Sequence, residues 1–403
     1  MTGTRPTPRP RPPLRSGAFF VVLAALAGAG AATAQEPDTA RVRDPREGPP
    51  SLPSQDTVPA DTVDSLPPPP GLPGLGPGGE PGWSRGVWEW SREDLLRLPD
   101  LSVLQLLERI PGVLPVRADL VNQPEAGAVF GAAAGAIRWV VDGFVLDPLM
   151  APTFDPSRLS LLALERVRVE RRVTGATVWL ETLAPDDPRV KSVIEAGTGD
   201  YGINLFRGMF LAPEVLGGPV GAGFERLSSA GFVPGSSNHT VTWLKWTWAR
   251  DSSGVQLEFR QSSIDREGVG ERVVGSRADW VVRARRLLGP VTAEAYVGAT
   301  TVDAEVGDED ATAVREGTPQ GGGRLGVDLA APVPWTAELA ARFRNHPRLP
   351  AQELELRAAA APLPWLTLEG DVLHAMWSGR RPTGRWSARA VLGFGIVVGF
   401  VSL

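Results

Sequence analysis

Three short pieces of sequence between Trp90 and Arg172 decide the expected fold: LLERIPGV at 106–113, WVVDG at 139–143 and LERVRV at 164–169. The first piece ends a helical run, because its apolar residues recur at helical spacing and the Pro-Gly pair at 111–112 cannot continue a helix. The second is an apolar strand that ends in Asp-Gly, a common tight-turn pair. The third alternates as a strand does. Together they predict a small α+β domain.

Two helices are expected in this domain. Ser91 to Asp94 forms a Ser-x-x-Asp capping pattern before an apolar run, which predicts the start of the first helix. The second helix is predicted over 101–110. Its apolar face, formed by Leu106, Leu107 and Ile110, is expected to pack on a sheet made by the strands at 137–141 and 164–170.

In their order and spacing, the three pieces resemble the plug domain of TonB-dependent outer-membrane receptors. The resemblance implies a plug over 86–188 followed by a barrel. After Val169 the family usually has Gly-Pro and then a Tyr-Gly turn, whereas this sequence continues differently from Arg171 to Trp179. The plug signature residues that the resemblance marks are Ile110, Pro111, Gly112, Val141, Asp142, Gly143, Glu165, Val167 and Val169.

The first 34 residues have the pattern of a secretory signal peptide. Arginines precede a short apolar stretch at 18–27, and Ala32-Thr33-Ala34 has the small-x-small pattern of a cleavage site. We therefore expect an exported chain whose mature form begins at Gln35. An uncleaved membrane anchor is the alternative, although the apolar stretch is short for a transmembrane helix, which needs about 20 apolar residues.

Residues 35–85 are expected to form a disordered linker. Thirteen prolines fall between 35 and 83, and within this stretch no aromatic residue occurs before Trp83, so this segment cannot bury a core. Within it, Asp56, Thr57 and Val58 resemble the energy-coupling box that precedes the plug in this family. Such a box acts by adding a strand to the sheet of its partner. Ordinary disordered sequence is the alternative interpretation.

From 189 to 403, the sequence predicts about twelve antiparallel strands of roughly ten residues. Apolar and polar residues alternate in successive runs, for example at 255–260, 291–297 and 337–344, and Gly or Pro turns separate the runs. This pattern suits a transmembrane β-barrel, with one face toward lipid and the other toward a polar lumen. A soluble β-sandwich also alternates, but its strands are usually about 5–6 residues long.

Several tryptophans lie near the ends of these strands, where a membrane barrel carries an interfacial aromatic girdle. The Trp243-x-x-Trp246-x-Trp248 group could instead form a platform on which a ligand stacks. Because Trp246 and Trp248 share a face with Leu244, the lipid-facing anchor is the simpler interpretation. The predicted interfacial aromatics are Trp243, Trp246, Trp248, Trp335, Trp365 and Trp386.

The length of the barrel region conflicts with a complete receptor. Only 215 residues follow residue 188, whereas plugged transporters use 22 strands. A closed barrel of about twelve strands has a radius of roughly 12 Å, which is too small to hold a domain of about 100 residues. We therefore expect a partial barrel, truncated or frameshifted near Phe394. A smaller closed barrel with the plug on its periplasmic side is the alternative.

The rest of the sequence offers little for catalysis or cofactors. The net charge of −5 gives no basic surface for nucleic acid, the chain has no Cys, and its three His lie far apart. The G-x-G-x-x-G match at 197–202 precedes an alternating strand rather than a helix, so a hairpin turn is expected there instead of a nucleotide site. The run from Ser236 to His239 is expected to be a polar loop tip rather than part of a catalytic triad.

The sequence thus predicts a receptor-like protein of the outer membrane, without enzymatic activity and without a cofactor or metal. The resemblance implies that it binds and admits a small solute, whose identity the residues do not reveal, with membrane lipid and a TonB-type energy-coupling protein as partners. A non-transporting outer-membrane barrel with a structural or binding role is the alternative.

Overall fold

The computed structural model describes residues 69, 71–72, 86–117, 123–132, 135–172, 175–230, 235–267, 272–307, 312–329, 333–363, 365–392 and 398–402. The chain divides into two units, Met1–Pro59 and Ala60–Leu403, and all described residues belong to the second. The predicted signal peptide at 1–34 and the possible energy-coupling box at 56–58 lie outside the described residues, as does almost all of the 35–85 linker.

The predicted α+β domain is built on a five-stranded sheet with the order β1-β6-β7-β4-β5, to which a two-stranded hairpin, β2-β3, is added. The strand β4 is parallel to β7, whereas the other neighbours in the sheet are antiparallel. The strands are β1 (Val87–Ser91), β2 (Val113–Arg117), β3 (Glu125–Val129), β4 (Ile137–Val141), β5 (Phe144–Val145), β6 (Leu164–Arg172) and β7 (Gly175–Thr182).

The first helix of the α+β domain, which is called the plug below, begins where the sequence predicts. The α2 helix (Arg92–Arg97) has a capping box, in which the Asp94 backbone N–H donates to Ser91 Oγ at 3.3 Å and the Ser91 N–H donates to Asp94 Oδ2 at 2.9 Å. The α3 helix (Val103–Leu107) is shorter than the predicted 101–110. Beyond it, Arg109 and Ile110 donate to carbonyls only three residues back, because the last turn tightens before Pro111. Short 3₁₀ turns, η3 (Pro156–Arg158) and η4 (Leu161–Ala163), lead into β6.

The core of the plug lies between α3 and the sheet. Leu106 and Leu107 are fully buried and Ile110 is nearly so, which confirms the predicted apolar face. They pack with Val167 and Val169 of β6, whose side chains are also fully buried. Burying a Leu or Val contributes about 1.5–3 kcal/mol, so this cluster supplies much of the stability of a domain of this size.

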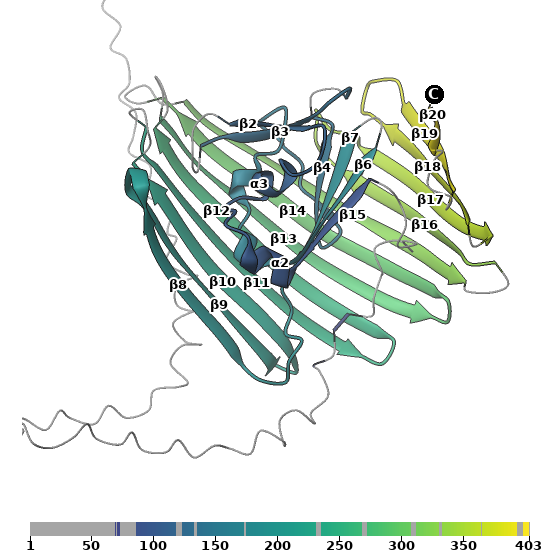
Figure 1. Cartoon of the computed structure of the whole chain (residues 1–403), viewed down its shortest axis with the longest axis horizontal. Coiled ribbons are helices and arrows are strands. Elements are labelled where there is room, and N and C mark those ends of the chain that lie inside the picture. The colour runs from purple at the N-terminus through teal and green to yellow at the C-terminus, as the bar shows by residue number, and fades with distance from the viewer. Residues whose placement is uncertain are drawn as a thin grey trace, which may run out of the picture. The chain divides into compact units, whose positions relative to one another are not determined.

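The second part is one antiparallel sheet of thirteen strands among the described residues, each paired with the next along the chain. The order runs from β20 to β8 without closing, which matches a partial β-barrel. The plug lies against one face of this sheet (Figure 1). The strands are β8 (Lys191–Gly199), β9 (Ile203–Val215), β10 (Gly218–Ser229), β11 (Ser237–Arg250), β12 (Ser253–Glu267), β13 (Arg272–Leu288), β14 (Val291–Val306), β15 (Thr312–Leu329), β16 (Trp335–Arg344), β17 (Gln352–Leu363), β18 (Leu366–Met376), β19 (Thr383–Leu392) and β20 (Val398–Ser402).

The two faces of the large sheet differ as the alternation predicts. In β13, Arg277, Asp279 and Arg283 point toward the plug and are buried, whereas Trp280 points away and is 45% exposed. Leu325 and Leu356 are also exposed on the outer face. Most strands are longer than the ten residues expected, and β15 reaches 18. The G-x-G-x-x-G match forms the predicted turn, with η5 (Asp200–Gly202) joining β8 to β9.

The plug sits beside the middle of the strands, and the alternative with the plug outside a closed small barrel is therefore wrong for the described residues. Lys245 and Arg283, which contact the plug, lie well inside β11 and β13. The size limit derived for a closed twelve-stranded barrel does not apply, because the described sheet is open. Within the described part of the chain, none of the helices has the length and apolar character needed to span a membrane.

Candidate functional site at the plug–sheet interface

The first contact between the plug and the large sheet is made by the turn between β4 and β5. Asp142 and Gly143 have φ values of 47° and 86°, so both adopt the left-handed conformation that an Asp-Gly turn tolerates. The Thr182 backbone N–H donates to Asp142 Oδ1 at 2.9 Å, and the Thr182 hydroxyl donates to Oδ2. The end of β7 therefore fixes the orientation of the Asp142 carboxylate.

Cations of the large sheet surround this turn. Lys245 of β11 lies 3.5 Å from Asp142 Oδ2 and also donates to the Thr182 carbonyl oxygen at 3.1 Å. A Cβ placed on Gly143 would lie 2.8 Å from Arg283 Nη1 and 3.2 Å from Arg324 Nη2. A side chain at this position would therefore collide with Arg283 and crowd Arg324, which, together with the positive φ, explains why the turn has glycine here.

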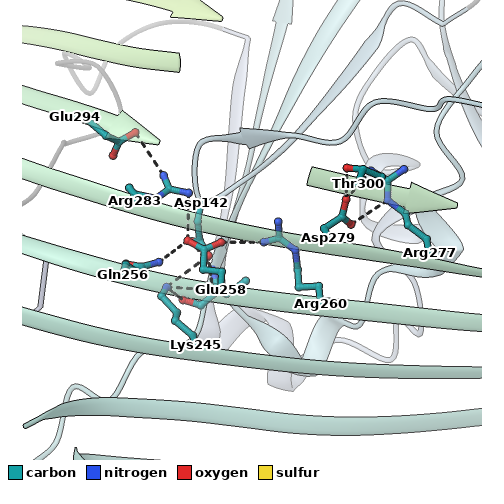
Figure 2. A network of polar contacts seen from close by, with 11 residues as sticks. Asp142, Lys245, Gln256, Glu258, Arg260, Arg277, Asp279, Arg283, Glu294 and Thr300 are labelled. Atoms are coloured by element: carbon teal, nitrogen blue, oxygen red, sulfur yellow. Dashed lines mark hydrogen bonds and ion pairs between the residues drawn. The ribbon is translucent and has the colours of Figure 1, made fainter. Parts of the chain in front are cut away.

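Lys245 and Arg283 belong to a network of ion pairs on the inner face of the sheet (Figure 2). Glu258 is 3.1 Å from Arg283 and 3.2 Å from Arg260, and Glu294 is 3.5 Å from Arg283. Burial alone would raise the pKa of Asp142, but the charges of Lys245 and Arg283 outweigh it and hold that pKa below its ordinary value. The plug thus contributes a charged carboxylate to a network that is otherwise formed by sheet residues.

A second contact lies farther along the sheet. Arg138 of β4 pairs with Glu353 at 2.7 Å and with Glu355 at 2.9 Å, both on β17. The Asp147 carboxylate is 3.2 Å from Arg344 Nε of β16, and the Asp147 carbonyl accepts a hydrogen bond of 2.7 Å from Arg277. The segment just after the Asp142-Gly143 turn is therefore also held by charged groups of the sheet.

A third contact involves the loop before β6. Asp155 pairs with Arg266 of β12 at 2.7 Å, and the same guanidinium donates to Ser157 Oγ. The Ser160 hydroxyl donates to Glu225 of β10 at 2.6 Å. Burial would raise the pKa of Asp155, but Arg266 and the hydrogen bond from Ser157 lower it, with the net result that the pKa is depressed.

The Asp155 contact makes the stability of the docked plug depend on pH. Because the folded pKa lies below the unfolded value of about 3.9, the contact stabilises the fold above pH ~4 and loses this effect as the pH falls through the folded pKa. We expect Asp155→Asn to cost about 1–3 kcal/mol at pH 7, and the difference from wild type to close below pH 4. Urea unfolding of the full chain in detergent, measured between pH 7 and pH 3, would test this.

The matched control is Asp251→Asn in the β11–β12 turn, where the side chain is 89% exposed. This variant should unfold with wild type at every pH. If the difference in unfolding free energy between Asp155→Asn and wild type stayed constant down to pH 3, the expectation would be contradicted.

Apolar contacts between the plug and the sheet are few and local. Phe144 packs edge-on against Tyr296 of β14, with ring centroids 6.2 Å apart, and the buried Val281 of β13 belongs to the main apolar cluster of the plug. A second small cluster joins Ala163 and Leu183 to Leu211 and Trp243 of the sheet. Most of the described contacts between the two parts are therefore made by charged and polar side chains.

The predicted plug signature residues lie in two places. Ile110, Val167 and Val169 are core residues, whereas Asp142 and Gly143 contact the large sheet directly. Val141 is buried beside them, and Glu165 is half-buried at the start of β6. Pro111 accepts a hydrogen bond of 2.5 Å at its carbonyl from Arg171, and Gly112 has a φ of 78°. Their grouping as a functional signature stays a prediction.

The interpretation of Trp243 as an interfacial aromatic is wrong. Its side chain is only 3% exposed and packs on the plug side, because odd-numbered residues of β11 point toward the plug. Trp248, Trp335, Trp365 and Trp386 are each 37–41% exposed, and Trp246 is half-buried with its indole N–H donating to the Val215 carbonyl at 3.1 Å. For these five, the girdle remains a prediction.

The polar run at 236–239 also differs from expectation. Ser237 begins β11, and Ser237 and His239 are 3% and 2% exposed, so the run is not a loop tip. The sequence reasoning also gave no role to Arg266, Arg283 and Glu353. The signal that could have found them is the polar face of the alternating strands, since a charged residue on every second position must face either a lumen or another domain.

The comparisons with known proteins agree with this architecture. A structure of the siderophore receptor PirA from Acinetobacter baumannii has a TM-score of 0.65 at 11% identity, covering 77% of this chain and 59% of the receptor. The copper transporter OprC gives 0.61 at 14% identity, with 76% and 60% covered. The hemophore receptor HasR of Serratia marcescens, solved with HasA and heme, gives 0.59 at 14% identity, with 76% and 52% covered. No family model and no curated protein sequence matches the chain.

The chain therefore has the fold of TonB-dependent receptors, with a plug domain followed by a partial β-barrel. It spans about three fifths of the length of the solved receptor PirA. At these identities the likeness concerns the fold, and the solutes of those receptors are properties of those proteins.

Proposed function

We propose that the protein is a TonB-dependent receptor-like protein of the outer membrane, which binds a small solute and admits it when the plug moves. The observation that carries this proposal is the chemistry of the plug–sheet interface. Its main contacts are ion pairs, such as Asp142 with Lys245, Arg138 with Glu353 and Asp155 with Arg266. Its described apolar contacts are fewer: Val281 and Tyr296 of the sheet join the edge of the plug core, and a second small cluster surrounds Trp243.

An interface of this kind can separate without a large penalty. Bringing two charges out of water costs about as much as their attraction returns, so a buried ion pair adds little net stability. When water enters, each charged group is solvated again. A plug held by a continuous apolar core would instead lose about 25 cal/mol for every Å² of apolar surface exposed. The charged interface between plug and sheet therefore favours a plug that can be displaced and can then return.

The proposal extends to location and partners. The outer face of the large sheet carries exposed apolar residues such as Leu257, Trp280 and Leu368, which suits contact with membrane lipid. The energy for displacing the plug would come from a TonB-type protein that pairs with the segment around 56–58. We propose a receptor rather than an enzyme, in line with the receptors and the transporter that share the fold.

Deleting residues 35–83 tests the proposal. We expect cells that produce the full chain to take up at least one of a panel of iron complexes, heme or copper, and the deletion to reduce that uptake to background. The physical reason is that the deletion removes the candidate energy-coupling segment and leaves the plug and the sheet intact. Outer-membrane levels of both proteins are compared by fractionation, and the N-terminal sequence of the full-length protein should start at Gln35.

A finer variant separates energy coupling from simple loss of the linker. Proline at 57 and 58 removes the backbone N–H groups that strand addition needs, whereas alanine at the same positions retains them. Uptake should fail with proline and persist with alanine. If full-length and deleted chains take up the solutes equally, the protein is instead a passive or structural barrel.

A further inference from the structure

The described ion pairs between the plug and strands β11 to β16 have one polarity: the plug supplies the acid and the sheet supplies the base. Asp142 pairs with Lys245, Asp155 with Arg266 and Asp147 with Arg344. Both polarities are found at β17, where Arg138 of the plug meets Glu353 and Glu355 and Glu170 of the plug lies 3.7 Å from Arg357. Those two acids also have sheet partners, because Glu353 lies 2.6 Å from Arg342 and Glu355 lies 2.6 Å from Arg357.

Removing the plug would therefore break ion pairs of one polarity on the β11–β16 surface, and the one plug arginine described there, Arg158, donates to a neutral hydroxyl, that of Ser262, at 3.5 Å. In the described ion pairs, Lys245 is paired with Asp142 and Arg266 is paired with Asp155. When the plug leaves, these two cations lose those partners. Arg344 still has a sheet partner, Glu353 at 2.8 Å. Arg283, which lies next to Gly143 when the plug is docked, still pairs with Glu258 and Glu294.

The two cations are spread along the length of the strands. Arg266 is paired in register with Ser237, and Lys245 is paired with Glu258. Ser237 and Lys245 are eight positions apart on β11, which corresponds to about 27 Å along the strand. Arg266 lies near one end of β12, and Lys245 lies well inside β11. Positive charge would thus be uncovered near one end and near the middle of the inner face.

We propose that the passage opened by the plug is electropositive along β11–β16 and serves an anionic solute. This inference rests on the proposed receptor function and specifies its substrate class. Before the plug moves, its carboxylates Asp142, Asp147 and Asp155 occupy the positions that the anionic groups of the solute would later pass. Charges in a passage with low-dielectric walls act strongly on a solute of opposite sign, and such focusing changes rates by roughly 10–10³-fold.

Two uptake probes of similar kind separate charge from size. A ferric tris-catecholate is trianionic, because three doubly charged ligands surround a trivalent ion, whereas a ferric tris-hydroxamate is neutral. The test variant is Lys245→Gln with Arg266→Gln. The control is Arg250→Gln with Arg272→Gln, which changes the net charge equally at side chains that are 80% and 52% exposed.

We expect wild type to take up the anionic complex faster than the neutral one, and the test variant to lower this ratio by about tenfold. The control should keep the wild-type ratio. Using a ratio removes effects of a loosened plug, because those act on both probes. Charge-retaining replacements, Lys245→Arg with Arg266→Lys, should also keep the ratio and rule out a packing defect.

The remaining outcomes overturn the inference in distinguishable ways. If wild type admits the neutral complex as fast as the anionic one, or if the test variant slows both equally, the passage is not selective for anions while the receptor function stands. If neither complex enters and the panel of other solutes also fails, the receptor function itself falls, and this inference falls with it.

Discussion

Replacing Gly143 by valine is expected to prevent the plug from docking on the large sheet. The residue has a φ of 86°, where a β-branched side chain is strained, and its Cβ would lie 2.8 Å from Arg283 Nη1. Arg283 is the far end of a flexible side chain in principle, but here it is 2% exposed and held by Glu258 and Glu294. It cannot move aside without breaking ion pairs that are buried.

The expected cost has two parts. The left-handed backbone costs about 1–2 kcal/mol for a residue other than glycine. Overpacking adds about 1–3 kcal/mol, and a buried charge that loses its partner costs about 3–5 kcal/mol. Protease digestion of the full chain in detergent should therefore cut the plug in Gly143→Val under conditions that leave the wild-type plug intact, while the large sheet remains protected.

The chain contains a control for the backbone part alone. Leu216 and Gly217, in the turn between β9 and β10, have φ values of 54° and 78°, close to those of Asp142 and Gly143. No atom lies within 4 Å of a Cβ built on Gly217. Gly217→Val should thus carry the strain without the collision and leave the plug protected. Equal protease sensitivity of the two variants would mean that Gly143 is needed only for its backbone conformation.

Replacing Leu107 by aspartate is expected to unfold the plug itself. The side chain is fully buried in the cluster between α3 and the sheet. Losing a buried Leu costs about 2–5 kcal/mol, and an unpaired buried carboxylate costs more. A domain of this size has only about 5–15 kcal/mol of stability. In the full chain, the plug should become sensitive to protease and the thermal unfolding midpoint of the plug should disappear.

Arg109→Asp is the matched control, two residues away and also a change to aspartate. The Arg109 side chain is 45% exposed and pairs with Asp100 at 2.9 Å. Losing a pair at the surface costs about 0–1 kcal/mol, so this variant should keep a protected plug. If both variants lost protection to the same extent, the assignment of the buried face of α3 would be incorrect.

Local chemistry made much of the fold predictable. The capping box at Ser91 and Asp94, the Asp142-Gly143 turn and the strand at Ile137–Val141 all appear where the sequence placed them. Each depends on interactions between near neighbours, which a short sequence window contains. The alternation of the long strands likewise indicated which residues share a face, because the side-chain period of a strand is two.

The limits of this reasoning are visible at Trp243. The same period of two that places Trp246 and Trp248 with Leu244 puts Trp243 on the opposite face, with Lys245. The prediction grouped the three tryptophans by residue type and ignored that Trp243 lies on the opposite face of the strand. The predicted helix at 101–110 was too long for a similar reason, since a helical pattern of apolar residues continues through a turn that tightens before Pro111.

By itself, the sequence determined the capping box at Ser91, the Asp142-Gly143 turn, the long antiparallel strands and the polarity of their two faces, because each follows from the order of neighbouring residues. Only the tertiary structure decided which charges meet across the interface. Asp142 and Lys245 are 103 positions apart, and Arg138 and Glu355 are 217 apart. An alternating strand specifies that a charge faces inward but not which residue it will meet. The partner depends on where the plug docks, and the docked position is set by the shapes and charges of the two parts together.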